Sequence, residues 1–201
     1  MTSAAAADGL PRDGTPEVAL IGRSNVGKSS LINALVRQRL ARTSAAPGKT
    51  RLANVYRVAR GAAPPLYLVD LPGYGYARGG AHAAQEFEAL TRGYFQRGQA
   101  AGILLVDARH PGLPSDPAAW QWIQGGAGVG AAAIVATKVD KLARGERIRA
   151  MRELESVFET SVLPVSAVTG EGLDQLWRMI EQLASSIEAT AQRPRPRPRK
   201  R

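Results

Sequence analysis

The chain has 201 residues, a formal net charge of +10, 44% hydrophobic residues and no cysteine. This length and composition suit one ordinary domain with a hydrophobic core, rather than two domains of comfortable size. The lack of cysteine excludes disulfides and thiolate metal sites, and it fits a reducing cytosol. No stretch approaches the roughly 20 apolar residues of a membrane-spanning helix.

The two ends of the chain differ in composition from the part between them. Residues 1–15 are rich in alanine and have neither a basic region nor a long apolar run. We therefore interpret them as a disordered leader rather than a signal peptide. Residues 190–201 end in alternating arginine and proline, which can form neither a helix nor a sheet ladder. We predict a disordered basic tail there and one folded domain over residues 16–189.

Between these ends, apolar runs typical of buried strands alternate with segments whose apolar residues recur at helical spacing. Strands are predicted over residues 18–21, 52–58, 66–69, 102–107, 131–136 and 161–166. Helices are predicted over residues 28–39, 83–98, 115–124, 145–158 and 171–189. This alternation predicts an α/β fold with a mixed, mostly parallel six-stranded sheet and helices on both faces. The second strand has more polar alternation, so it could lie at the edge and run antiparallel.

A glycine-rich loop follows the first predicted strand and leads into the first predicted helix. It fits the phosphate-loop pattern G-x-x-x-x-G-K-[ST] with Gly22, Arg23, Ser24, Asn25, Val26, Gly27, Lys28 and Ser29. In such a loop, backbone N–H groups at a helix N-terminus surround an anion. The lysine can reach the outer phosphates, and the serine hydroxyl can ligate magnesium. The loop therefore predicts a P-loop NTPase fold with a nucleoside triphosphate as ligand.

An acidic segment, Asp70-Leu71-Pro72-Gly73, follows the third predicted strand. Because ligands of open α/β sheets lie beyond the carboxyl ends of the strands, this segment should lie beside the phosphate loop. Asp70 can hold magnesium through water. The N–H of Gly73 can approach a γ-phosphate because this residue has no side chain. Alternatively, Asp70 only begins a turn before Pro72 and Gly73.

Two further segments follow the last two predicted strands and point to guanine. The first holds Thr137, Lys138, Val139 and Asp140, and the second holds Val165, Ser166 and Ala167. The Asp140 carboxylate can accept hydrogen bonds from N1–H and the 2-amino group of guanine, whereas adenine offers neither donor. The small residues of the second segment let the backbone approach the guanine O6. This pattern favours GTP over ATP. An ATPase is the alternative if Asp140 only caps a helix.

In order and spacing, these four segments resemble those of the TRAFAC class of GTPases. The match narrows to the EngB (YihA/YsxC) family of bacterial GTPases, which the chain resembles over roughly residues 16–187. The runs that carry the resemblance are Gly22 to Leu35, Pro47-Gly48-Lys49-Thr50, Asp70-Leu71-Pro72-Gly73-Tyr74-Gly75-Tyr76, Asp107-Ala108-Arg109-His110-Pro111 and Thr137-Lys138-Val139-Asp140-Lys141. The run from Asp70 to Tyr76 is the most specific of them.

The resemblance implies a GTP-binding and GTP-hydrolysing switch with Mg2+ as cofactor. Thr50 would match the switch threonine, which ligates magnesium together with Ser29 and meets the γ-phosphate only in the GTP state. Four neighbours would also contact the nucleotide: Gly48, Lys49, Arg51 and Leu52. Lys28, Thr50 and Asp70 would carry catalysis. They would act by positioning and electrostatics, without a covalent step.

The resemblance also implies a cytoplasmic protein that serves large ribosomal subunit assembly and normal cell division and septation. Its partners would be GTP or GDP and the large ribosomal subunit or its rRNA, and we expect a monomer. A competing hypothesis comes from residues 193–201, which carry six basic residues and no acidic one. The chain could be an RNA- or ribosome-binding assembly factor in which GTP turnover is incidental. The tail could also serve only solubility.

Three positions bear on how far the general GTPase pattern applies. Tyr74 stands where many GTPases place the glutamine that orients the attacking water. We therefore expect slow intrinsic hydrolysis that needs a partner or a monovalent cation. Asn25 could help to hold K+, or it could only stabilise the loop by local hydrogen bonds. Thr137 stands where the general guanine motif has asparagine, which leaves Asp140 with most of the base discrimination.

Overall fold

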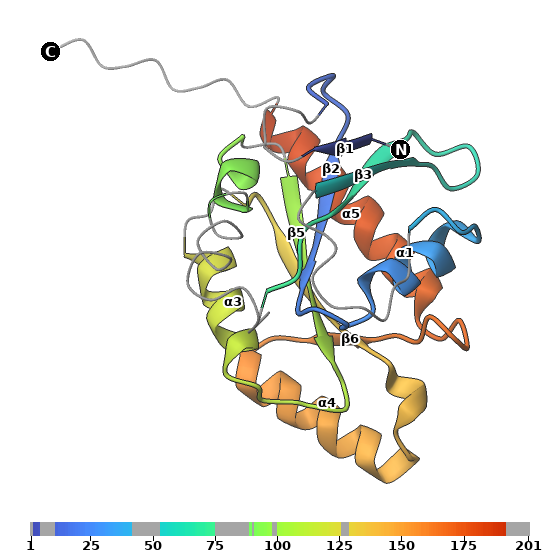
Figure 1. The fold of residues 1–201 in the computed structure, drawn as a ribbon, viewed down its shortest axis with the longest axis vertical. Coiled ribbons are helices and arrows are strands. Elements are labelled where there is room, and N and C mark those ends of the chain that lie inside the picture. The colour runs from blue at the N-terminus through green and yellow to red at the C-terminus, as the bar shows by residue number, and fades with distance from the viewer. Residues whose placement is uncertain are drawn as a thin grey trace, which may run out of the picture.

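The structure is a computed structural model, and it describes residues 2–4, 11–41, 53–74, 89, 91–97, 100–125 and 129–191. Its seven strands are β1 (Thr2–Ala4), β2 (Glu17–Gly22), β3 (Ala53–Val58), β4 (Leu66–Asp70), β5 (Ala100–Asp107), β6 (Ala132–Thr137) and β7 (Val162–Pro164). They form one sheet in the order β1-β3-β4-β2-β5-β6-β7 (Figure 1). The strands from β4 to β7 in this order are parallel, whereas β3 is antiparallel to both of its neighbours. The predicted α/β class and the antiparallel second strand are confirmed.

The sheet holds the six predicted strands and one more, β1, which comes from the segment predicted to be a leader. Thr2–Ala4 pair with residues 53–55 of β3, so β1 and not β3 lies at the edge. Two further leader residues contact the domain. The carbonyl of Pro11 accepts a hydrogen bond from Arg97, and Asp13 accepts one from the hydroxyl of Tyr67 at 2.8 Å. The small residues of β1 show no periodic apolar pattern, so their pairing was not predictable from sequence.

Helices and one short 3-10 helix connect the strands. They are α1 (Lys28–Val36), α3 (Ser115–Gln124), η3 (Val139–Lys141), α4 (Arg144–Phe158) and α5 (Leu173–Ala191). The first helix ends earlier than predicted because Arg37 adopts a left-handed conformation with φ of 52°. The side chain of Asn33, within this helix, accepts hydrogen bonds from the N–H groups of Leu40 and Ala41, which follow the helix.

Two other helices differ from their predicted bounds or are described only in part. α5 begins and ends two residues later than the predicted 171–189, so it enters the segment assigned to the tail. Gly172 precedes it with φ of 75°, where a Cβ would overlap the carbonyl oxygen of Pro164. Of the predicted helix 83–98, residues 89 and 91–95 are helical, and most of the remainder lies outside the described residues.

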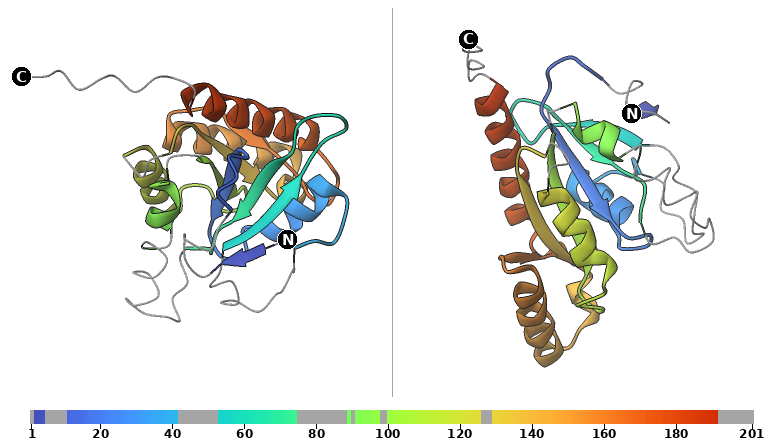
Figure 2. Two further views of the ribbon diagram at one scale, coloured as in Figure 1. Left: turned by 90° about the horizontal axis from the view of Figure 1, so that it is seen from above. Right: turned by 90° about the vertical axis from the view of Figure 1, so that its left-hand side faces the viewer.

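The helices form one layer on each face of the sheet (Figure 2). α1 and α5 cover one face, and α3, α4 and residues 91–95 cover the other. Val18 and Leu20 of β2 pack toward the first layer, whereas Ala19 and Ile21 pack toward the second. All four are buried, as the period-two alternation of a central strand requires. This packing holds the carboxyl ends of β2, β4, β5 and β6 at one edge of the sheet.

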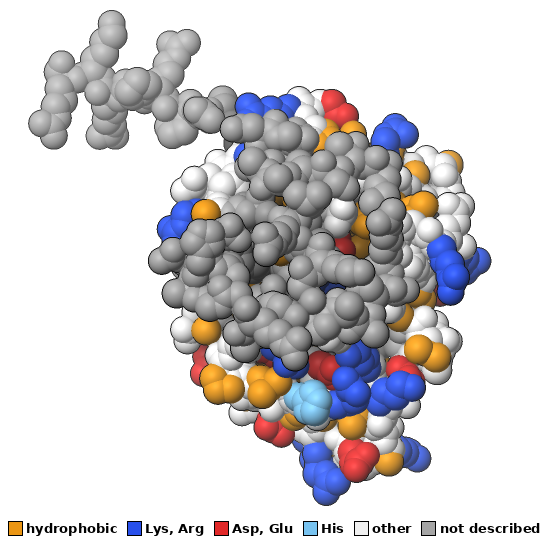
Figure 3. All heavy atoms as spheres, viewed as in Figure 1, with side chains coloured by type: hydrophobic (Ala, Val, Ile, Leu, Met, Phe, Trp, Pro, Cys, Tyr) orange, Lys and Arg blue, Asp and Glu red, His pale blue; other side chains and the backbone are white. Residues whose placement is uncertain are grey.

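The surface carries charges of both signs. Figure 3 shows Lys and Arg side chains mixed with Asp and Glu over the lower part of the face that it presents. On α4, for example, Arg147 pairs with Glu171. Among the described helices, none is long and apolar enough to cross a membrane. The basic residues 193–201 lie outside the part of the chain that the structure describes.

Candidate functional site

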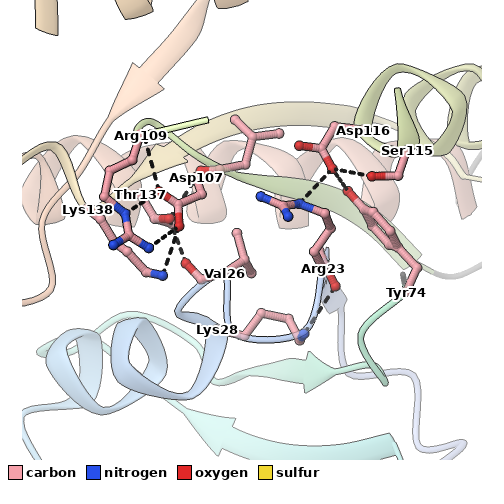
Figure 4. Close-up of polar contacts among 12 residues, drawn as sticks. Arg23, Val26, Lys28, Tyr74, Asp107, Arg109, Ser115, Asp116, Thr137 and Lys138 are labelled. Carbon is pink, nitrogen blue, oxygen red and sulfur yellow. Dashed lines mark hydrogen bonds and ion pairs between the residues drawn. The ribbon is translucent and has the colours of Figure 1, made fainter. Parts of the chain in front are cut away.

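The predicted phosphate loop connects β2 to α1 and folds tightly. Gly27 has φ of 110°, and a Cβ on Gly22 would lie 2.8 Å from the carbonyl oxygen of Leu105. Both positions therefore favour glycine. Lys28 is the first residue of α1, and its Nζ donates to the carbonyl oxygen of Gly22 at 3.3 Å (Figure 4). The lysine thus reaches back across the loop at the helix N-terminus, where the first N–H groups have no partner inside the helix.

Asp70 ends β4 beside β2, and its side chain is almost fully buried. One carboxylate oxygen, Oδ1, has no hydrogen-bond partner among the described residues. Burial raises the pKa of Asp70 to about 6, although the charge of Lys28 opposes this shift. Burial also lowers the pKa of Lys28, with Asp70 opposing. A buried carboxylate oxygen without a partner is costly. A cation or a metal-bound water is the kind of group that would satisfy it.

The other predicted metal ligands are Ser29 and Thr50. Ser29 is the second residue of α1 and is partly buried. Thr50 lies outside the described residues, as do Gly48, Lys49, Arg51 and Leu52. The described ranges hold no cluster of three or more His, Cys, Asp or Glu that could bind a metal. The hydroxyl of Ser29 is nevertheless an oxygen ligand of the kind that Mg2+ prefers.

The segment after β4 lies against the phosphate loop. Leu71 and Pro72 are buried. A Cβ on Gly73 would lie 2.7 Å from the backbone nitrogen of Ser24, so no larger residue fits there without a shift. The N–H of Ser24 donates to the carbonyl oxygen of Tyr74 at 3.2 Å. The structure thus brings two predicted segments together, as expected from their places after parallel strands.

Asp140 and Ser166 form a hydrogen-bonded pair beyond β6 and β7. The Ser166 hydroxyl donates to Oδ1 of Asp140 at 2.7 Å and accepts from the N–H groups of Val168 and Thr169. The bond from Ser166 is the main cause of a lowered pKa of Asp140. Nζ of Lys141 lies 3.5 Å from Oδ2. Asp140 is therefore an ionised and oriented acceptor, as recognition of the guanine N–H groups requires.

Thr137 and Lys138 connect this end of the site to the phosphate loop (Figure 4). The Thr137 hydroxyl donates to the carbonyl oxygen of Val26 at 2.7 Å and lies 3.1 Å from that of Val106. Nζ of Lys138 donates to the carbonyl oxygen of Asn25 at 2.6 Å. Threonine therefore keeps a link to the loop at a position where the general pattern has asparagine. Asn25 has φ of 64° and is exposed.

Backbone contacts place the remaining predicted residues. The N–H of Val139 donates to the carbonyl oxygen of Val165 at 3.4 Å, and the N–H of Val165 donates to that of Ala136 at 2.8 Å. Both valines are buried. Ala167 follows Ser166 in a turn. The predicted segments after β6 and β7 thus lie side by side.

Asp107, at the end of β5, was not predicted as a site residue. Its carboxylate accepts from Nζ of Lys138 at 2.9 Å and from Nε and Nη2 of Arg109 at 2.9 and 2.8 Å. Burial alone would raise the pKa of Asp107, but the hydrogen bonds from Arg109 and Lys138 outweigh it and hold that pKa well below its usual range. The sequence does contain a signal for Asp107: like Asp70, it is an acidic residue at the end of a continuous apolar strand.

These contacts define the class of protein. A phosphate loop between β2 and α1, a buried carboxylate at the end of β4 and an oriented Asp–Ser pair beyond β6 and β7 all lie at the carboxyl end of the sheet, where α/β folds bind nucleotides. The fold and this site are those of a P-loop GTPase.

Comparisons with known proteins identify the family. Residues 17–128 match a protein family described as 50S ribosome-binding GTPase. The chain is 44% identical over 180 residues to a probable GTP-binding protein EngB of Chlorobaculum tepidum, which covers 87% of this chain and 90% of the relative. It is 39% identical over 189 residues to the EngB of Lacticaseibacillus casei, with 90% and 92% covered. The chain belongs to the EngB family of GTP-binding proteins and is a GTP-hydrolysing enzyme.

Solved structures share the fold. A crystal structure of a probable GTP-binding protein engB matches with a TM-score of 0.64 at 20% identity, over 84% of this chain and 98% of that one. Aquifex aeolicus Era Y63A bound to GDP and AlF4- matches with a TM-score of 0.69 at 22% identity, over 85% of this chain and 57% of that one. These structures confirm the predicted fold, and the relatives described above confirm the predicted family.

Proposed function

We propose that this GTPase is a Mg2+-dependent switch that acts in assembly of the large ribosomal subunit, with residues 16–189 as its GTPase domain. The observation that carries the switch is the contact of Gly73 and Tyr74 with the phosphate loop, where Ser24 donates to Tyr74. A γ-phosphate that enters the loop meets this segment directly. The match to a family described as 50S ribosome-binding GTPase supports the ribosomal partner.

Each part of the nucleotide would have its own set of residues. Backbone N–H groups of the phosphate loop and Lys28 would bind the phosphates. Ser29 and Thr50 would ligate magnesium and Asp70 would hold it through water, which would satisfy the buried Oδ1. When bound, the ion would neutralise charge between the β- and γ-phosphates. Asp140, oriented by Ser166, would select guanine, with the N–H of Ala167 at the guanine O6.

We expect intrinsic hydrolysis to be slow. Tyr74 holds the position of the usual glutamine, and its hydroxyl donates to Asp116 at 2.9 Å. A hydroxyl committed in this way does not orient a water at the γ-phosphate. A partner or K+ would then supply the missing stabilisation. Hydrolysis rates are measured in KCl and in NaCl for the natural chain and for Asn25→Ala. If K+ supplies the stabilisation, KCl should stimulate hydrolysis by the natural chain but not by Asn25→Ala.

Co-sedimentation tests the ribosomal role. The full chain is mixed with purified large or small ribosomal subunits in GTP, GDP or no nucleotide. We expect binding to the large subunit in GTP and release in GDP, and we expect Lys28→Ala to lose this difference. Binding that is the same in all three conditions would contradict the switch.

A second candidate function is an RNA-binding assembly factor in which GTP turnover is incidental. The six basic residues of 193–201 favour it, because Arg binds phosphate by paired hydrogen bonds. Deletion of residues 193–201 in the same sedimentation experiment decides between them. The RNA-binding alternative predicts that binding to the ribosomal subunit is lost when the tail is deleted and is the same in GTP, GDP and no nucleotide.

The cellular proposals are a cytoplasmic, monomeric protein and a link to cell division and septation through the supply of ribosomes. Depletion of the protein should then cause precursors of the large subunit to accumulate before septation fails. The reverse order of these two events would argue against a primary role in ribosome assembly.

A further inference from the structure

A buried carboxylate outside every predicted motif lies beside the switch segment. Asp116, in the first turn of α3, is 2% exposed. Its Oδ1 accepts a hydrogen bond from the Tyr74 hydroxyl at 2.9 Å and lies 3.2 Å from Nε of Arg23 (Figure 4). The Ser115 hydroxyl is 3.3 Å from the same oxygen. One acidic side chain thus contacts the phosphate loop and the segment after β4 at once.

The two contacts with Asp116 differ in kind. The Tyr74 hydroxyl makes a directional hydrogen bond. The guanidinium of Arg23 is close enough for an ion pair, but Nε is buried and completes no hydrogen bond within the described residues. Burial raises the pKa of Asp116, while the Tyr74 hydrogen bond and the Arg23 charge oppose the shift. Tyr74 therefore provides the geometry of the cluster, and Arg23 provides electrostatic attraction.

The backbones of the same two segments are also joined. Arg23 and Tyr74 form an isolated parallel bridge, in which the Ser24 N–H donates to the Tyr74 carbonyl at 3.2 Å. The space for a side chain on Gly73 is taken by Ser24. In this arrangement the Ser24 N–H is bonded to Tyr74 and is not offered to a phosphate. A γ-phosphate that engages the Ser24 N–H must therefore displace a contact that Asp116 helps to hold.

We propose that Asp116 is a positioning residue that holds Tyr74 against the phosphate loop and thereby favours GDP over GTP. Asp116 acts through Tyr74 and Arg23 and does not touch the nucleotide itself. A ligand shifts a conformational equilibrium only by its different affinity for the two states. Loss of the anchor should therefore strengthen binding of GTP relative to GDP, because only GTP has to move the segment. This inference rests on the proposed switch.

Two variants remove the anchor with little change of shape. Tyr74→Phe deletes one hydroxyl and keeps the ring, and Asp116→Ala deletes the carboxylate. We expect each to raise the ratio of GTP to GDP affinity by about 10-fold, in line with one hydrogen bond to a charged group. The double variant should add little to either, because both remove the same contact. Asp116→Asn keeps an acceptor for the hydroxyl and should give an intermediate ratio.

The matched control is Arg97→Met, which breaks a buried ion pair with Glu17 at the opposite end of β2. Affinities are measured by competition against a fluorescent guanine nucleotide with Mg2+ present, together with the unfolding temperature of each variant. The control should lower the unfolding temperature and leave the GTP to GDP ratio unchanged.

Unchanged or lowered ratios in both Tyr74→Phe and Asp116→Ala would overturn the role of Asp116. A ratio that rises equally in Arg97→Met would also overturn it, because the effect would then be one of general stability. If the natural chain binds neither GTP nor GDP, the proposed function itself fails, and this outcome is distinct from an unchanged ratio.

Discussion

Buried charges lie near both ends of β2, and they differ in whether they are paired. At its start, Glu17 accepts two hydrogen bonds from Arg97, at 2.9 and 3.3 Å, and Arg97 also lies over the ring of Tyr94. Beyond its end, Oδ1 of Asp70 has no partner among the described residues, and Lys28 donates to the backbone carbonyl of Gly22 across the loop. The buried charge at the start of β2 is paired within the chain, whereas a carboxylate oxygen beyond its end has no partner in the described part of the chain and could bind a ligand.

This difference separates stability from function. Buried charges are tolerated when they are paired and hydrogen-bonded, and they are costly otherwise. The pair at Glu17 therefore belongs to the fold. The unpaired groups around the phosphate loop lower the stability of the ligand-free protein, and bound phosphate and cation would satisfy them. Variants at the start of β2 should consequently change the free energy of unfolding, whereas variants beyond its end should change the affinity for nucleotide.

The largest effect on stability is expected from Arg97→Met. This change leaves Glu17 buried without its cation, and burial already raises the pKa of that carboxylate. We expect the free energy of unfolding to fall by about 3 kcal/mol, as when one partner of a buried ion pair is removed. Chemical denaturation measures it. GTP affinity, corrected for the folded fraction, should not change, and a loss of affinity would remove the contrast between the two ends.

The opposite pattern is expected from Lys28→Met, which keeps the length of the side chain but removes its charge. We expect affinity for GTP and GDP to fall by about 100-fold, because a buried charge-assisted contact with phosphate is lost. Stability without nucleotide should be equal or higher, since an ammonium that burial disfavours is gone. Titration calorimetry and thermal unfolding test both parts. Retained affinity would mean that Lys28 does not bind phosphate.

A smaller effect, with a pH dependence, is expected from Asp70→Asn without nucleotide and magnesium. Burial raises the pKa of Asp70 from its ordinary 3.8 to about 6, so the folded state binds more protons than the unfolded state between these values. The stability linked to this group is present below about pH 4 and is lost as the pH rises through 6. We expect Asp70→Asn to be more stable by about 2 kcal/mol at pH 8 and equal near pH 4. A gain that is independent of pH would contradict this account.

The parts of the site that lie on short motifs were predictable from the sequence. Gly22 to Ser29 follow a buried strand and precede a helix, and Asp70 and Asp140 follow later strands. Because parallel strands end at one edge, the order of the motifs along the chain already indicated that they meet. Ser166 and Asp140 lie close together for the same reason, although the hydrogen bond between them was not predicted.

Contacts between distant segments were not predictable in this way. Asp116 and Tyr74 lie 42 residues apart, and Lys138 and Asn25 lie 113 residues apart. Nothing in the local sequence of α3 shows that its first turn reaches the phosphate loop, because this depends on how the helix packs over β5. The pairing of β1 was hidden for another reason, since strand pairing through backbone atoms leaves no pattern in small side chains.

Titration of the natural chain and of Asp140→Asn with GTP, ATP and XTP tests the central assignment most directly. The natural chain should bind GTP at least about 100-fold more tightly than ATP, because only guanine offers donors to the Asp140 carboxylate. Asp140→Asn should lose GTP affinity and gain affinity for XTP, since an amide can donate to the additional carbonyl of xanthine. Equal binding of ATP and GTP by the natural chain, or unchanged GTP affinity in Asp140→Asn, would contradict guanine selection by Asp140.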